Sequence, residues 1–144
     1  MPPMPNQETI EDFFEQQTIA VLSTRNHDGT IHSAPILYQF DGGTFHLGTQ
    51  LGARRVANIE KDSRCTLLIE HRTEPFRFAM VYGDGRVVEG DLERRTSIIG
   101  RMYPDDVASG VATFMHASFG IVGIEITPTE IVTVDSSQAG LTDG

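Results

Sequence analysis

The 144-residue sequence predicts one α+β domain built around a mainly antiparallel, six-stranded β-barrel with short flanking helices. Segments rich in β-branched and aromatic residues alternate with turn signals such as Asp28-Gly29 and Asp41-Gly42-Gly43. The segments with helical periodicity are few and short, and 14 Gly and 7 Pro imply many turns. We therefore expect a barrel scaffold with helices at its openings, an ordered core at about residues 9–135, and polar tails.

The first predicted element is a short amphipathic helix over residues 9–16. Thr9 is a suitable N-cap, and Asp12 follows three residues later, as in a capping box. Phe13 and Phe14 fall on the apolar face of this helix. We expect them to close one end of the core.

A β-hairpin should follow, with strands at residues 18–24 and 31–40 joined by a turn at residues 26–29. Pro35 lies inside the second strand and has no N–H to donate to a neighbouring strand. The second strand should therefore have a free edge or a bulge at Pro35, which leaves backbone groups open to another partner.

A third strand at residues 44–47 leads into a tight turn and a helix from about residue 53 to 62. Arg54 and Arg55 stand at the start of this helix, where free backbone N–H groups and the helix dipole already favour an anion. Two guanidinium groups would strengthen such a site for a phosphate or carboxylate. The alternative is a solvated helix face whose arginines are balanced by nearby acidic residues.

The second half of the chain completes the barrel. Its predicted elements are a strand at residues 64–70, a long strand at 76–89 in which Gly83 and Gly85 mark a bulge or a hairpin, helices at 91–103 and 105–119, a strand at 121–127 that ends at Pro128, and a last strand at 131–134. The tail from Ser136 is polar and is expected to be disordered.

Charge and composition exclude several classes of function. The net charge is −9 with a pI near 4.8, which argues against a nucleic-acid or membrane-surface partner. Residues 54–77 are the exception, with six basic and four acidic groups. Cys65 is the single cysteine, which suits a small core residue in a reducing, cytoplasmic setting. The histidines have no metal-ligand spacing, so we expect no metal site.

Several of these features together resemble the pyridoxamine 5′-phosphate oxidase-like family of split-barrel flavin proteins. They are the Asp28-Gly29 hairpin, the strand containing Pro35, the turn at residues 41–43, the run from Leu47 through the two arginines to Ile59, and the strand that begins near Cys65. The resemblance covers about residues 10–135. It implies a split barrel, a homodimer, and FMN or the deazaflavin F420 bound between the subunits.

The resemblance also implies which residues bind the cofactor. Arg54 and Arg55 would hold the phosphate, and Thr49 with the backbone of Gly52 and Ala53 would complete its cradle. The isoalloxazine ring would lie along the strand from His32 to Leu37. The full predicted set is His32, Ser33, Pro35, Leu47, Thr49, Gly52, Ala53, Arg54, Arg55 and, on the segment given by the other subunit, Phe78 and Met80.

The family's name-giving activity is not expected here, because nothing after Ile131 resembles the oxidase's substrate-binding segment and the chain has no Trp. The sequence therefore suggests an FMN-dependent oxidoreductase that takes hydride from a reduced nucleotide or small organic donor, with F420 as an alternative cofactor. A non-enzymatic flavin- or haem-binding module remains open, as does an empty barrel. No catalytic acid or base is predicted, since a flavin supplies the hydride chemistry itself.

Overall fold

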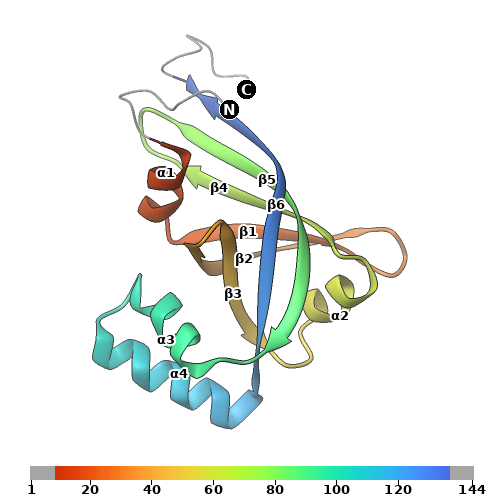
Figure 1. The fold of residues 1–144 in the computed structure, drawn as a ribbon, viewed down its shortest axis with the longest axis vertical. Coiled ribbons are helices and arrows are strands. Elements are labelled where there is room, and N and C mark those ends of the chain that lie inside the picture. Colours follow the sequence, from red (N-terminus) through yellow and green to blue (C-terminus); the bar gives the residue numbers. More distant parts are fainter. Residues whose placement is uncertain (1–8, 137–144) are drawn as a thin grey trace.

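The computed structural model describes residues 9–136, which form six strands and four helices (Figure 1). In chain order these are α1 (Ile10–Gln16), β1 (Ile19–Arg25), β2 (Ile31–Asp41), β3 (Thr44–Gln50), α2 (Arg54–Lys61), β4 (Arg64–His71), β5 (Arg77–Glu89), α3 (Leu92–Gly100), α4 (Asp105–Phe119) and β6 (Ile121–Asp135). Every element begins and ends within a few residues of its predicted bounds, with one exception. The two strands predicted at residues 121–127 and 131–134 form the single strand β6.

The strands close into an antiparallel barrel in the order β1-β2-β3-β6-β5-β4, which confirms the predicted α+β barrel. Alternate side chains point inward and form one core, with Leu22, Leu67 and Ile124 at 1% exposure or less. This alternation is the period-two pattern that the apolar segments of the sequence display.

Helix α1 closes one end of the barrel, as predicted. Thr9 and Asp12 form the expected capping box, and Phe13 and Phe14 are both buried. The Phe14 ring lies 4.8 Å from the Phe45 ring in an edge-on arrangement, and the buried Tyr38 hydroxyl donates to the Phe14 carbonyl at 2.5 Å. The aromatic face of the helix therefore completes the core.

Strands β5 and β6 lie side by side (Figure 1), and their pairing tests the bulge or hairpin predicted at the glycines of β5 and the strand end predicted at Pro128. The glycines of β5 mark a bulge and not a hairpin, because the register shifts between Tyr82 and Gly83 while the strand continues. The predicted break at Pro128 is wrong, since β6 is continuous. One extra residue of β6 is accommodated where Pro128 pairs with Gly83, so the missing proline N–H interrupts the pairing locally without ending the strand.

The barrel is split along β2. This strand pairs with β1 from Ile31 to Leu37, but it pairs with β3 only from Tyr38 onward. Pro35 therefore lies where the second edge of β2 has no partner strand among the described residues, as its missing N–H predicts. Helices α3 and α4 form a hairpin that lies beside the end of β3 that follows Leu47, where β3 no longer pairs with β2 (Figure 1).

The two predicted tails lie largely outside the described residues, except that the Ser136 N–H donates to the Phe76 carbonyl at 3.0 Å. Within residues 9–136, no helix has the length and apolar character needed to cross a bilayer.

Candidate functional site

A cavity of about 270 Å³ lies outside the barrel wall at the place where β2 and β3 separate. Five segments line it: β2, β3, the start of α2, α3 and α4. The lining residues are Pro35, Ile36, Leu37, Gly48, Thr49, Gln50, Ala53, Arg55, Arg95 and Met115, and we refer to this space as the Arg55 cavity.

Arg55 reaches the cavity from the first turn of α2. Ala53 is the N-cap and offers no side-chain acceptor, and no acidic residue occupies the first turn. The half-buried guanidinium has no ion pair or hydrogen bond with any of residues 9–136, and its Nε is buried without a partner. Burial lowers the pKa of Arg55. The N-terminus of α2 and the Arg55 guanidinium thus place positive charge without an acidic partner at the same wall of the cavity.

Arg95 enters the cavity from α3 and is only 8% exposed. Its Nη1 donates to the Gly48 carbonyl at 2.5 Å and its Nη2 lies 3.7 Å from the Met115 sulfur, while its Nε is buried without a partner. The pKa of Arg95 is lowered, first by burial and then by the positive charge of Arg55. Two cations therefore share one desolvated space, which is unfavourable unless an anion joins them.

The chemistry of this arrangement is anion binding. Guanidinium groups form strong charge-assisted hydrogen bonds to phosphate and carboxylate oxygens, and the first N–H groups of α2 add further donors. Pro35, Leu37 and Met115 supply an apolar wall beside the cations. A ligand with one anionic end and one apolar part would match both halves.

The structure brings four predicted site residues together in this cavity, namely Pro35, Thr49, Ala53 and Arg55. Thr49 is buried and Pro35 lies on the exposed edge of β2. Gly52 makes the turn just before α2, with a positive φ of 90° that favours glycine. Thr49, Gly52, Ala53 and Arg55 are adjacent because β3, its turn and α2 follow one another directly, and Pro35 reaches the same cavity from β2.

Arg54, the second predicted phosphate ligand, lies elsewhere. It is exposed and lines a separate groove with Arg25, His27 and Lys61. Successive helical residues point about 100° apart, so the two adjacent arginines serve different surfaces.

The remaining predicted residues are spread over the barrel. Ser33 and Met80 line an outer groove across β1, β2, β4 and β5, and the ring of Phe78 lies 5.9 Å from that of Phe76. Leu47 is buried in the core, and His32 is half-buried with an unpartnered Nδ1. None of these five lines the Arg55 cavity.

Arg95 and Met115 are site residues that the sequence analysis missed. They lie on α3 and α4, far along the chain from Arg55, and no spacing rule connects them. The one signal that points to them is a second pair of adjacent arginines, Arg94 and Arg95, in an otherwise acidic half of the chain.

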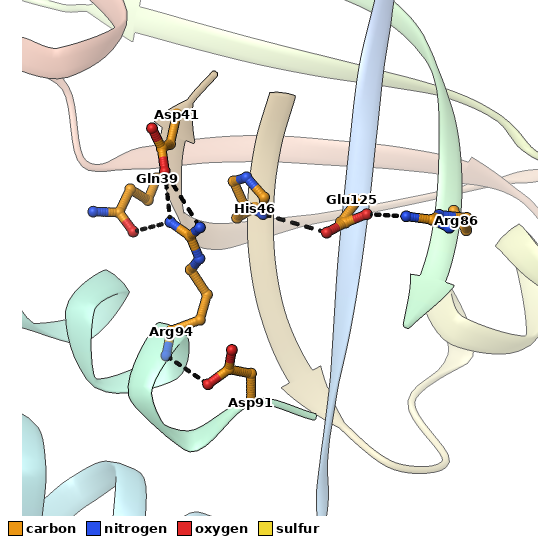
Figure 2. A network of polar contacts seen from close by, with 7 residues as sticks. All are labelled: Gln39, Asp41, His46, Arg86, Asp91, Arg94 and Glu125. Atoms are coloured by element: carbon orange, nitrogen blue, oxygen red, sulfur yellow. Dashed lines mark hydrogen bonds and ion pairs between the residues drawn. The ribbon is translucent and has the colours of Figure 1, made fainter. Parts of the chain in front are cut away.

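Figure 2 shows the contacts of Arg94, the neighbour of Arg95, with side chains of β2. Arg94 donates to the Gln39 side chain at 2.9 Å and to the Asp41 carboxylate at 3.3 Å, and its backbone N–H bonds the N-cap residue Asp91. Arg94 therefore links α3 to β2, and its positive charge is already paired with a carboxylate.

A second polar group in Figure 2 crosses three strands. Glu125 lies between Arg86, at 2.5 Å, and His46, whose Nδ1 is 3.7 Å away. His46 and Glu125 line another cavity, of about 310 Å³, that shares Gly48 and Arg95 with the Arg55 cavity. Arg94 also lines this second cavity and is paired with Asp41, so among the described residues of its lining Arg95 is the arginine without a carboxylate partner.

Comparisons with known proteins agree with this architecture. Residues 7–135 match the family model described as pyridoxamine 5′-phosphate oxidase. Among solved structures, a conserved hypothetical protein from Mycobacterium tuberculosis is 24% identical, with a TM-score of 0.76 over 94% of this chain and 88% of the other. A search of curated proteins gives no match.

Two further structures share the fold at lower identity. An F420 reductase is 17% identical, with a TM-score of 0.67 over 85% of this chain and 94% of its own. The haem storage protein HutZ from Vibrio cholerae is 13% identical, with a TM-score of 0.69 over 88% and 92%. Because the family model spans nearly all of the described barrel, the chain belongs to the pyridoxamine 5′-phosphate oxidase-like family.

Proposed function

We propose that this protein is a homodimeric flavin-dependent oxidoreductase that holds the phosphate of FMN, or alternatively of F420, in the Arg55 cavity. The observation that carries the proposal is the uncompensated charge of Arg55 and Arg95 in one cavity next to the start of α2. A protein gains nothing in stability from two such cations, so a bound anion best explains them.

The open edge of β2 supports the position of the ring. From Ile31 to Leu37 this edge has no partner strand among the described residues, and Pro35 and Leu37 form the apolar side of the cavity. An isoalloxazine ring placed here would have backbone groups on its rim and apolar contacts on its face. When bound, the flavin supplies the hydride chemistry, and the chain orients it and excludes water.

The outer face of the barrel supports a second copy as partner. Two large apolar side chains of the groove that Ser33 and Met80 line are exposed, Ile31 of β2 at 62% and Tyr82 of β5 at 39%. Such a patch on a soluble chain commonly marks an interface. Ser33 and Met80 lie on the same face, so dimer formation would cover those predicted residues.

F420 remains an alternative because it also carries a phosphate, and one structural neighbour is named as an F420 reductase. A haem-binding module is the third candidate, because another neighbour is a haem storage protein. The three candidates differ in the absorption of the bound group.

The test is titration of the purified chain with FMN, F420 and haemin, followed by visible absorption. We expect saturable binding of FMN or F420 and oxidation of a reduced nucleotide or another donor by the loaded protein, with a mass in solution of two 15.9 kDa chains. Binding of haemin alone, with a Soret band, would replace this proposal with the haem module. Binding of none of the three would contradict it.

A further inference from the structure

We propose that Arg95 is a second ligand of the phosphate and makes the site select phosphate-bearing cofactors over their phosphate-free forms, and that Gly48 positions it. This inference rests on the proposed function and deepens it. It assigns a role to a residue on α3, outside the segment from β3 to α2 to which the sequence points.

The contacts of Arg95 differ from those of the structural arginines. Arg94 has a carboxylate partner, and Arg101 donates to backbone carbonyls of Glu15 and Gln17 at 2.7 Å. Arg95 is 8% exposed, yet it has one backbone acceptor, a weak sulfur contact and an unpartnered Nε. A buried guanidinium with so few acceptors is unfavourable on its own, so its remaining donors are available to a ligand.

Gly48 determines where this guanidinium lies. A Cβ added at Gly48 would stand 2.5 Å from Cδ and 2.6 Å from Nη1 of Arg95, closer than real contacts allow. Only glycine lets the arginine side chain lie flat on β3 and reach the cavity while it donates to the Gly48 carbonyl. Any side chain at residue 48 would move the guanidinium away from the site.

The pairing of Arg95 with Arg55 accounts for selectivity. The phosphate monoester of FMN carries about −1.5 to −2 charges at pH 7, and the phosphodiester of F420 carries about −1; either group presents acceptor oxygens that two guanidinium groups can share. A ligand that ends in a hydroxyl offers no charge to the two cations. Loss of Arg95 should therefore weaken phosphate-bearing ligands and leave phosphate-free ligands almost unchanged.

The experiment measures dissociation constants for FMN and riboflavin, and for F420 and its phosphate-free deazaflavin, with the wild-type protein and three variants. We expect Arg95→Met to reduce the preference for the phosphate-bearing member by about 30-fold, with riboflavin or the free deazaflavin bound as before. Gly48→Ala should lose a similar preference although both arginines remain. Arg86→Met is the control, because it removes the same charge at a side chain that is 73% exposed and does not line the Arg55 cavity.

A double variant tests positioning. If Gly48 acts through Arg95, Gly48→Ala combined with Arg95→Met should lose no more preference than either change alone. Additive losses would overturn the positioning role of Gly48. Near-UV circular dichroism should match the wild type in every variant, and Arg95→Lys, which keeps the charge without the planar fork, should give an intermediate preference.

Two further outcomes separate this inference from the function on which it rests. If the wild-type protein prefers phosphate-bearing ligands and Arg55→Met abolishes that preference while Arg95→Met keeps it, the inference about Arg95 fails alone. If the wild-type protein binds neither FMN nor F420, the proposed function and this inference fail together.

Discussion

Replacement of Arg101 by Met should be among the most destabilising single changes in this protein, because this side chain joins α1 to the rest of the fold. Its guanidinium donates to the carbonyls of Glu15 and Gln17 at 2.7 Å, to that of Phe14 at 3.4 Å, and to that of Tyr38. Most of these carbonyls lie at the end of α1, where no N–H group of the helix donates to them. Loss of the arginine would leave several of them without a donor.

The size of the effect follows from these bonds. A hydrogen bond to a charged group contributes about 1.5–3 kcal/mol, and the sum is reduced here because part of the guanidinium is open to water. We expect Arg101→Met to lower the free energy of unfolding by about 3 kcal/mol, which for a domain of this size lowers the melting temperature by roughly 10 °C.

The assay is urea unfolding followed by circular dichroism, with thermal melting as a second readout. Arg72→Met is the control, because Arg72 is 78% exposed and pairs only with Glu70, so we expect a change below about 0.5 kcal/mol. An Arg101→Met variant within about 1 kcal/mol of the wild type would refute the reasoning, since it would mean that water replaces the arginine at every carbonyl.

Two further predictions concern buried polar groups. Asn58→Ala should lower the free energy of unfolding by about 2 kcal/mol, because the Asn58 amide of α2 donates to the Thr24 hydroxyl at 3.0 Å and to the Asn26 side chain at 2.9 Å. An unchanged midpoint of urea unfolding would contradict this. Burial raises the pKa of the Cys65 thiol from about 9 to about 12, so the folded state keeps a proton that the unfolded state loses. Stability should therefore fall as pH rises from about 9 towards 12, less steeply in Cys65→Ala, and equal slopes in urea titrations of the two proteins would contradict the shift.

Local patterns predicted most of the fold because they are set by residues close in sequence. The capping box at Thr9, the turn at Gly29 and the edge at Pro35 each follow from one or two residues that are close in sequence, and the structure confirms them. The break predicted at Pro128 is wrong because the effect of a proline in a strand depends on how that strand pairs with the strand opposite. A proline can remain in a strand when that strand has a bulge beside it, and the pairing of Pro128 with Gly83 is not visible in sequence.

The candidate site was predictable only in part for the same reason. Thr49, Ala53 and Arg55 were expected together because they follow one another from β3 into α2, and all three line one cavity. Arg95 comes from α3, and its approach depends on how α3 packs across Gly48, which is a tertiary contact. Sequence reasoning also treated Arg54 and Arg55 as one pair, although the helix turns them toward different surfaces.

The measurement that tests the central claim most directly compares Arg55→Met with Arg54→Met, adjacent changes that remove the same charge from the same helical turn. With FMN or F420, whichever the wild-type protein binds, Arg55→Met should raise the dissociation constant at least about 30-fold, because it removes a half-buried cation from the cavity. Arg54→Met, at an exposed and screened position, should raise it by less than about 5-fold. Equal effects of the two changes, or unchanged binding by Arg55→Met, would contradict the assignment of the Arg55 cavity as the phosphate site.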